Sequence, residues 1–250
     1  MLPKIGFIDT YSIFLILGIV SALFVFEVYC RTHHFDKIKM TAIEILGVVS
    51  TIIGLGFANV FQNIYDLIQN PKEFFWSGNF TFYGGLIGGV GVFLLGYFFI
   101  IKKKYGPALN EILKIAPASI ATAHAFGRIG CFMNGCCYGK PTDSWLGIQF
   151  TTTTTKVLPT NLFEAIFLFI LSGILFLLAM EKLGKWNFPI YMMSYGIWRF
   201  LIEYLRGDYR GSFVPGLTPS QFWSIILFIG GLSYLIVLIV LAIRRKRLIL

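Results

Sequence analysis

The chain has 250 residues, of which 56% are apolar and only 13% are charged. A soluble globular domain has about 45–50% apolar and about 25% charged residues, so this composition excludes an ordinary soluble domain and indicates a membrane protein. The net charge of +9 does not imply a nucleic-acid partner, because many basic residues stand between apolar runs, where they orient a membrane protein and meet anionic lipid.

Long apolar segments recur along the whole chain. About 20 apolar residues in a helix span a bilayer core of about 30 Å. Seven segments approach this length, at residues 11–29, 42–64, 80–101, 110–132, 161–180, 189–205 and 219–243. They predict an all-α polytopic bundle of about seven transmembrane helices, forming a single integral membrane domain over residues 1–250. No small-residue cleavage site follows the first segment, so we expect it to be retained as a helix.

The basic residues predict the orientation of this bundle. Lys and Arg number 12 in one alternate set of loops, which includes the C-terminal tail, and 6 in the other set, which includes the N-terminal head. Because positive charge accumulates on the cytoplasmic side, the N-terminus is expected outside and the C-terminus in the cytoplasm.

Three basic residues fall inside the predicted spans. Lys114 lies near a cytoplasmic end and can extend its amine to the interface. Arg128 and Arg199 lie deeper in their spans, where a charge costs at least about 2.5–3.5 kcal/mol near the centre of a helix. Both arginines are therefore candidates for a functional site that faces the interior of the bundle.

The alternating direction of the helices predicts that these arginines meet other polar residues. The fourth and sixth helices run outward and carry Arg128 and Arg199, whereas the third and fifth run inward and begin near Tyr83 and Glu164. All four side chains are thus expected at one depth near the outer surface.

The sixth segment carries its polar residues at helical spacing. Tyr195, Arg199, Glu203 and Arg206 are 4, 4 and 3 residues apart and form one stripe of a helix. One interpretation is an ion ladder within the helix that neutralises itself. That interpretation does not explain the second arginine, Arg128, on another helix at the same level.

Glycines flank the polar residues of the third and fourth segments. They remove side chains where a backbone or a ligand approaches closely, and they allow a helix to break into a loop. Gly84 and Gly88 alternatively form a small-xxx-small face that packs against another helix. Guanidinium groups beside such a backbone at headgroup depth predict an anion site, and the abundant anion there is a lipid phosphate.

These motifs together resemble the prolipoprotein diacylglyceryl transferases of bacterial cytoplasmic membranes. The family signature Gly-Arg-x-Gly-Asn-Phe-x-Asn-x-Glu-x-x-Gly is matched at Gly127, Arg128, Gly130, Phe132, Asn134 and Gly139, with Cys131 and Cys136 replacing its internal Asn and Glu. Three further segments resemble family motifs in the right order: Tyr83-Gly84-Gly85-Leu86-Ile87-Gly88, Leu158-Pro159-Thr160-Asn161-Leu162-Phe163-Glu164, and the stripe from Tyr195 to Arg206. Gln221 matches the glutamine that opens the last helix.

The resemblance implies a reaction and a set of roles. The family moves the diacylglyceryl group of phosphatidylglycerol onto the lipobox cysteine thiol of a preprolipoprotein. The resemblance thus implies two partners, an anionic phospholipid of this or a related kind and the signal peptide of the preprolipoprotein. It implies no cofactor or metal. Carried over by position, Arg128 and Arg199 hold the phosphate, Asn134 and Tyr195 donate hydrogen bonds, and Glu203 with Arg206 organises the mouth of the cleft. The remaining substrate-binding candidates are Gly84, Gly85, Glu164 and Gln221.

Two departures from the family pattern affect this assignment. Tyr83 stands where the family has a histidine that is a proposed base, and a tyrosine of ordinary pKa about 10 is a poor base unless a neighbouring cation lowers that pKa. His124, one turn before Arg128, is the alternative base, or else a polar histidine of the core. The second segment has Asn59 in a stretch where the family usually carries an additional arginine.

Three of the four cysteines gather at the outer end of the fourth segment. Cys131, Cys136 and Cys137 have the spacing C-x4-C-C, which matches no usual zinc pattern. A disulfide such as Cys131–Cys136, small packed thiols, and a redox or metal role all stay open. Two other classes of function are a membrane transporter of lipid or solute and an outward-facing thiol oxidoreductase; the chain shows no internal repeat of the kind a transporter has.

Overall fold

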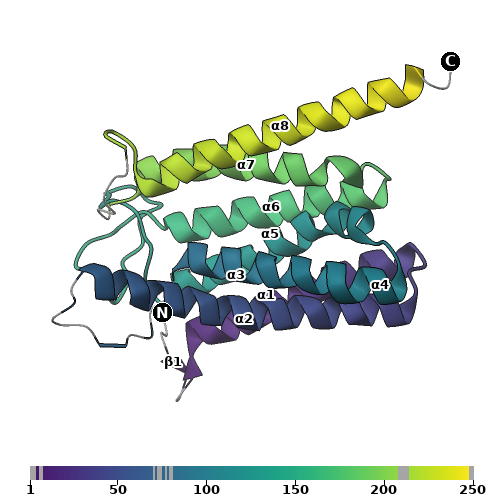
Figure 1. Ribbon diagram of the computed structural model, residues 1–250. Coiled ribbons are helices and arrows are strands. Elements are labelled where there is room, and N and C mark those ends of the chain that lie inside the picture. The colour runs from purple at the N-terminus through teal and green to yellow at the C-terminus, as the bar shows by residue number, and fades with distance from the viewer. Residues whose placement is uncertain are drawn as a thin grey trace. The chain divides into compact units, whose positions relative to one another are not determined.

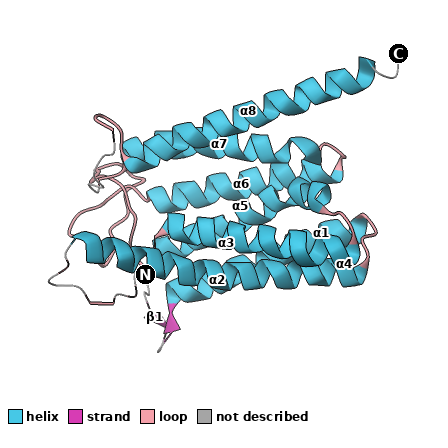
Figure 2. Ribbon diagram, in the orientation of Figure 1, coloured by secondary structure: helices cyan, strands magenta, loops and turns pink. Residues whose placement is uncertain are grey.

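The computed structural model describes residues 4–5, 8–69, 71, 75–76, 78, 81–207 and 214–247. Helices dominate this part of the chain, and the strands form only a two-residue antiparallel pair before the first helix (Figure 2). The predicted all-α class is thus confirmed. The chain divides into two compact units, residues 1–29 with 110–250 and residues 30–109, and each unit is described by itself.

The first unit contains most of the helices. Its elements are β1 (Lys4–Ile5), β2 (Ile8–Asp9), α1 (Thr10–Thr32), α5 (Leu109–Met133), α6 (Thr160–Met180), η2 (Gly184–Trp186), α7 (Asn187–Ile202), η3 (Glu203–Leu205) and α8 (Pro219–Arg247). Small side chains of α5 and Leu168 of α6 form a buried core against which Tyr191 and Tyr195 of α7 pack. Helix α8 lies along α7 (Figure 1), where Gly196 lets the backbone of α8 approach closely.

Polar contacts also join the helices of this unit. The hydroxyls of Thr122 on α5 and Ser172 on α6 share a hydrogen bond of 2.6 Å. The amide of Asn187, at the start of α7, donates to the backbone oxygens of Leu175 and Lys114. These bonds satisfy polar groups that are costly to leave unpaired in an apolar interior.

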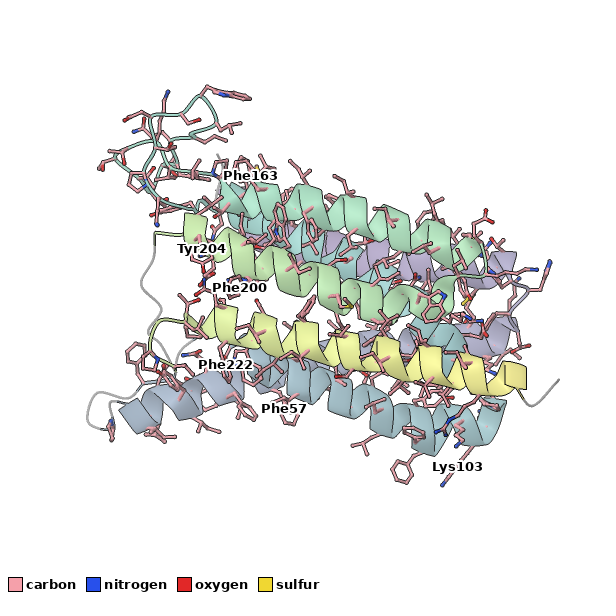
Figure 3. The ribbon with its side chains drawn as sticks, turned by 90° about the horizontal axis from the view of Figure 1, so that it is seen from above. Phe57, Lys103, Phe163, Phe200, Tyr204 and Phe222 are labelled. Carbon is pink, nitrogen blue, oxygen red and sulfur yellow. The ribbon has the colours of Figure 1, made fainter. Side chains whose placement is uncertain are left out.

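The second unit is built on two long helical segments. Helix α2 (Lys37–Gln69) is followed by a continuous helical run through α3 (Phe82–Gly96), the π-helical η1 (Tyr97–Ile101) and α4 (Lys102–Tyr105). Glycines lie at the contact between α2 and α3. A Cβ atom at Gly84 would lie 2.6 Å from Cβ of Phe61, and Gly88 presses in the same way against Phe57, which Figure 3 labels. The packing interpretation of Gly84 and Gly88 is therefore confirmed.

Helices cover the described parts of the seven apolar segments, with boundaries close to those predicted. Within the described residues, five helical stretches are long and apolar enough to cross a membrane: Thr10–Thr32, Lys37–Ile68, Gly84–Tyr105, Thr160–Met180 and Pro219–Arg244. Helices α5 and α7 are not among them, since α5 carries charged and polar residues and α7 has only 16 residues. The chain is a multi-pass helical protein, and the count of seven spans stays a prediction.

Helix α7 ends earlier than its polar stripe predicts. The chain tightens into the 3-10 turn η3 at Glu203, and Arg206 is extended, with φ −79° and ψ 146°. The backbone N–H of Lys140 donates to the oxygen of Leu205 at 2.8 Å, and Gly139 pairs with Arg206 as a β-bridge. The ion-ladder interpretation holds for its first step, the 2.9 Å pair of Arg199 with Glu203. The helical position expected for Arg206 is wrong, because pairing with the loop after α5 draws this residue out of the helix.

Candidate active site

A buried carboxylate joins three helices of the first unit. Glu164 follows the start of α6 and its side chain is 1% exposed. One of its oxygens lies 3.1 Å from Nε of Arg128 on α5, and the other accepts a hydrogen bond of 2.9 Å from the hydroxyl of Tyr195 on α7. His124, one turn before Arg128, has its Nε2 atom 3.9 Å from Glu164 and packs its ring edge-on against Tyr195. Glu164 thereby fixes the positions of side chains from α5 and α7.

The second arginine is held in a separate set of contacts. Nη2 of Arg199 lies 2.9 Å from Glu203 and donates to the hydroxyl of Ser220 at 2.8 Å. The hydroxyl of Thr218 donates to the other oxygen of Glu203 at 2.9 Å. The Arg199 and Arg128 charges both act on Glu164, so the two guanidinium groups belong to one electrostatic cluster. We call Arg128, Glu164, Tyr195, Arg199 and Glu203 the polar cluster.

The polar cluster retains an unused hydrogen-bond donor. Among the described residues, Nη1 of Arg199 is buried and has no hydrogen-bond partner, whereas Nε of Arg128 faces the Glu164 carboxylate at 3.1 Å. A buried guanidinium with a free N–H is costly unless a ligand completes it. The cluster can therefore bind an anion that accepts a hydrogen bond from Arg199 and is attracted by the charges of both arginines.

These contacts confirm part of the predicted convergence. Arg128, Glu164 and Arg199 come together from three different helices, as the alternating helix directions predict. Aromatic side chains mark the same end of the unit, where Figure 3 labels Phe163, Tyr204 and Phe222. Tyr83 belongs to α3 in the second unit, and its side chain lies outside the described residues. Its role as a base stays a prediction, as does that of His124.

Several other predicted site residues make packing contacts or hydrogen bonds within the protein. Gly84 and Gly85 of α3 lie against α2, where a Cβ atom at Gly85 would be 3.2 Å from that of Ala58. Arg206 donates from Nη1 to the backbone oxygen of Cys137 at 3.3 Å. Asn134 follows α5 and is half-buried.

Gln221 closes a helix cap. Its side-chain oxygen accepts from the backbone N–H of Thr218 at 3.1 Å, and the Thr218 hydroxyl accepts in return from the backbone N–H of Gln221 at 3.2 Å. This is a capping box at the start of α8, with Pro219 in the first helical position. The sequence Thr218-Pro219-Ser220-Gln221 carries the signal for this cap, but it does not predict that Ser220 contacts Arg199 and Thr218 contacts Glu203.

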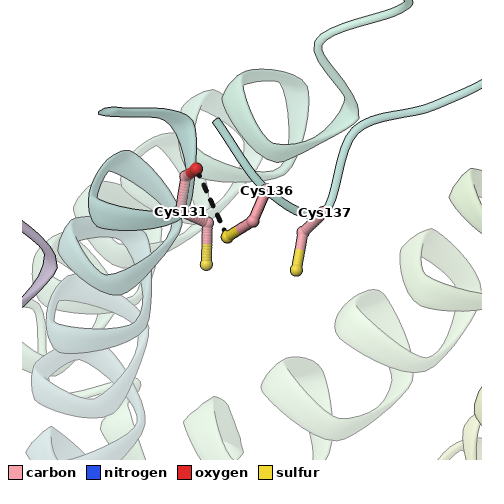
Figure 4. Close-up of side chains that lie close together, drawn as sticks. All are labelled: Cys131, Cys136 and Cys137. Carbon is pink, nitrogen blue, oxygen red and sulfur yellow. Dashed lines mark hydrogen bonds between the residues drawn. The ribbon is translucent and has the colours of Figure 1, made fainter. Parts of the chain in front are cut away.

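Three cysteines lie in the last turns of α5 and in the loop that follows, within reach of the Arg128 charge. All four cysteines of the chain are free, so the predicted alternative of a Cys131–Cys136 disulfide is not what the structure has. The sulfur atoms of Cys131, Cys136 and Cys137 lie within 4.8 Å of one another (Figure 4). Hydrogen bonds from the other two thiols hold the pKa of Cys137 below its ordinary value, and the nearby charges of Arg206 and Arg128 act in the same direction.

Comparison with known proteins gives the family. The family model for prolipoprotein diacylglyceryl transferase matches residues 2–237. Phosphatidylglycerol–prolipoprotein diacylglyceryl transferases from Clostridium tetani and from Clostridium perfringens are similar to the chain, at 34% and 35% identity, over 89% and 90% of this chain and 90% and 89% of theirs. One from Francisella tularensis is 28% identical over 96% of this chain and 92% of its own length. The chain therefore belongs to the prolipoprotein diacylglyceryl transferase family.

Proposed function

We propose that this protein transfers the diacylglyceryl group of phosphatidylglycerol to the lipobox cysteine thiol of a preprolipoprotein. The observation that carries the proposal is the buried Arg199, whose Nη1 has no partner, in one cluster with Arg128, within a chain of this family. The family match gives no support to a transporter or to a thiol oxidoreductase as the alternative function.

The chemistry needs a neutralised leaving group. The acceptor sulfur attacks a glycerol carbon of the donor lipid, a C–S bond forms, and the C–O bond to the phosphate breaks, with its electron pair leaving on glycerol phosphate. Negative charge on the phosphate is met by guanidinium groups, which stay protonated and can each offer two parallel N–H donors. Pre-organised donors of this kind stabilise the developing charge without reorganisation.

The polar cluster contains residues that position each arginine. Glu164 lies against Arg128 and Tyr195, whereas Glu203 and Ser220 lie against Arg199. In this proposal Arg128 and Arg199 contact the phosphate, and Glu164, Glu203 and Ser220 act as positioning residues. Asn134 and Tyr195 add hydrogen bonds near the lipid, and the signal peptide enters beside the loop after α5.

The proposal extends to the membrane and the orientation of the chain. We place the reaction at the outer face of a bacterial cytoplasmic membrane, with the N-terminus outside and the C-terminus in the cytoplasm. The twofold excess of basic residues in one set of loops supports this orientation. A reporter fused after Leu250 is expected in the cytoplasm, and one inserted near Thr153 is expected outside; the opposite result at both sites would move the polar cluster to the inner leaflet.

A reconstituted assay tests the reaction itself. The purified protein is mixed with diacyl-labelled phosphatidylglycerol and a lipobox peptide, and label on the peptide is measured. A peptide with serine in place of the lipobox cysteine is the control. Transfer to the cysteine peptide only, with release of glycerol phosphate, is expected. No label on either peptide, from protein that is folded and lipid-embedded, would refute the proposed function.

The base is tested in the same assay. Tyr83→Phe is expected to abolish transfer and Tyr83→His to restore part of it if Tyr83 takes the thiol proton. If His124 does so, His124→Ala has the larger effect and the rate of wild-type protein rises near pH 6.5, the ordinary histidine pKa. Full activity of the double variant Tyr83→Phe, His124→Ala would eliminate both residues as the base.

A further inference from the structure

The three-cysteine cluster is the only group of three or more His, Cys, Asp or Glu side chains among the described residues that is placed to hold a metal ion. Cys131 comes from the last turns of α5, and Cys136 and Cys137 from the loop that follows (Figure 4). A tetrahedral site with zinc–sulfur bonds of about 2.3 Å has sulfurs about 3.8 Å apart. Sulfurs that already lie within 4.8 Å of one another reach that spacing with movements of roughly 1 Å.

The surrounding loop is built to hold these sulfurs in place. Cys137 has φ +59°, a left-handed conformation that costs a residue with a side chain about 1–3 kcal/mol. The backbone oxygen of Cys136 accepts from the amide of Asn161 at 2.8 Å, and that of Cys137 accepts from the hydroxyl of Thr160 at 3.1 Å and from Arg206. The start of α6 and Arg206 therefore fix the strained loop from two directions. If the three cysteines served only as small side chains that fill space, the loop would not need a left-handed residue held by these hydrogen bonds.

The cluster offers three ligands and leaves one position open. Thiolates are soft ligands that suit zinc, and a zinc site with three protein ligands keeps its fourth position for water or substrate. Three thiolates and Zn²⁺ carry a net charge of −1, and the charges of Arg206 and Arg128 act on Cys137. A site with this composition can take a fourth sulfur ligand from outside the chain.

A cavity opens at two of the three cysteines. Cys136 and Cys137 line a cavity of about 600 Å³ together with the threonine run 152–155. Cys131 follows Arg128 by three residues on α5, so it lies one turn beyond it. Because the sulfurs of Cys136 and Cys137 lie within 4.8 Å of that of Cys131, a thiol bound at the cluster lies about one helical turn from the arginine proposed to hold the phosphate.

We propose that Cys131, Cys136 and Cys137 bind one Zn²⁺ ion and that its fourth position takes the acceptor cysteine thiol. The inference rests on the proposed function and specifies how the acceptor is activated. On binding zinc the thiol releases its proton to solvent. Its sulfur then attacks the glycerol carbon, and the C–O electron pair leaves with glycerol phosphate. Zinc supplies the thiolate that an ordinary tyrosine at position 83 is poorly suited to generate.

Metal content and cobalt spectroscopy test the site without turnover. The full-length protein, purified without chelators and under reducing conditions, is expected to hold one Zn²⁺ per chain by mass spectrometry. After replacement by Co²⁺, a thiolate-to-cobalt charge-transfer band is expected to intensify when a lipobox cysteine peptide is added, and not with the serine peptide. The proposal is overturned if the purified protein contains no zinc and cannot be loaded with Zn²⁺ or Co²⁺. It is also overturned if the bound metal is copper, or if the cobalt spectrum does not change when the thiol peptide is added.

Variants separate the cluster from other thiols. Cys136→Ser is expected to lose the metal, whereas Cys30→Ser in α1, outside the cluster, is expected to keep it and to retain transfer. Because a thiol of pKa about 8.5 is only a few per cent ionised at pH 7, metal-free protein is expected to be at least about tenfold slower at pH 7, with the gap closing toward pH 8.5. Re-addition of Zn²⁺ to chelated wild-type protein restores the rate.

The two proposals fail in distinguishable ways. Equal transfer by zinc-loaded and zinc-free wild-type protein across this pH range overturns the zinc site and leaves the proposed function standing. One zinc per chain and a cobalt spectrum that responds to the thiol, without transfer from any phospholipid, keeps the site and refutes the proposed reaction.

Discussion

Helices α2 and α3 of the second unit meet through glycines and phenylalanines, whereas α5, α6 and α7 of the first unit meet partly through a buried carboxylate and an arginine. In the first case Gly84 and Gly88 let the helices approach until Phe57 and Phe61 fill the contact. In the second, Glu164 is almost fully buried between Arg128 and Tyr195. Because the α2–α3 pair shows that small residues suffice to join helices in lipid, the charges of the first unit are not needed merely for packing. Their burial points to function.

Removal of the buried carboxylate is expected to have the largest effect on the stability of the first unit. Glu164→Leu leaves Arg128 as an uncompensated buried charge, which costs about 3–5 kcal/mol of folding free energy. Thermal unfolding in detergent measures the loss, with Glu181→Gln at an exposed site as the control. The double variant Glu164→Leu, Arg128→Met is expected to regain most of the stability but no transfer. A stable single variant would show that the pair is not buried as a unit.

Replacing the second arginine separates charge from geometry. Arg199→Lys keeps the positive charge but loses the planar group whose Nη1 is free to bind a ligand, so transfer is expected to fall about 100-fold, or about 2.7 kcal/mol, with little change in unfolding temperature. Arg244→Lys, at an exposed site near the end of α8, is the matched control. Unchanged transfer by Arg199→Lys at equal protein amount would exclude a bidentate phosphate contact.

The glycine contact allows an internal comparison within one helix. Gly84→Ala forces a Cβ atom against Phe61 and is expected to destabilise the protein by about 1–3 kcal/mol, whereas Gly91→Ala, with no atom within 4 Å, is expected to be neutral. Unfolding of both variants in detergent measures the difference. Phe61→Ala added to Gly84→Ala should recover part of the loss. Equal stability of both alanine variants would remove packing as the reason for Gly84.

The smallest expected effect concerns the helix cap. Gln221→Ala removes one half of the capping box and is expected to cost about 1 kcal/mol, while Gln221→Glu retains an acceptor oxygen and most of the stability. Comparing transfer with stability decides the role of Gln221. If Gln221→Glu is as stable as wild type yet inactive, the side chain also contacts substrate; if it is stable and active, the cap is its role.

The apolar segments predicted the helices closely, because length and hydropathy in lipid leave few alternatives for the backbone. The convergence of Arg128, Glu164 and Arg199 also followed from the sequence, since alternate helices run in opposite directions. The end of α7 did not follow. Residue spacing alone predicts a continuous stripe to Arg206, and the loop that pairs with Arg206 is remote in sequence.

The cysteine cluster shows a second limit of spacing arguments. Cys131 and Cys137 are brought together by the left-handed conformations of Gly135 and Cys137, which no helical or strand periodicity contains. Hydrogen bonds from Thr152, Thr160 and Asn161 hold these turns. Such contacts between distant segments decide whether an irregular loop gathers its side chains or separates them.

The hydrogen bonds that join α7 to the start of α8 have a consequence for biosynthesis. Ser220 contacts Arg199, and Thr218 contacts Glu203, yet both of these residues are synthesised after the two arginines. A nascent chain that ends before residue 218 contains both arginines but lacks two of the groups that hold Arg199 and Glu203. At about 5–20 residues per second, α8 emerges a few seconds after α7. The contacts that hold Arg199 and Glu203 are therefore completed only when the start of α8 has been synthesised and has packed against α7.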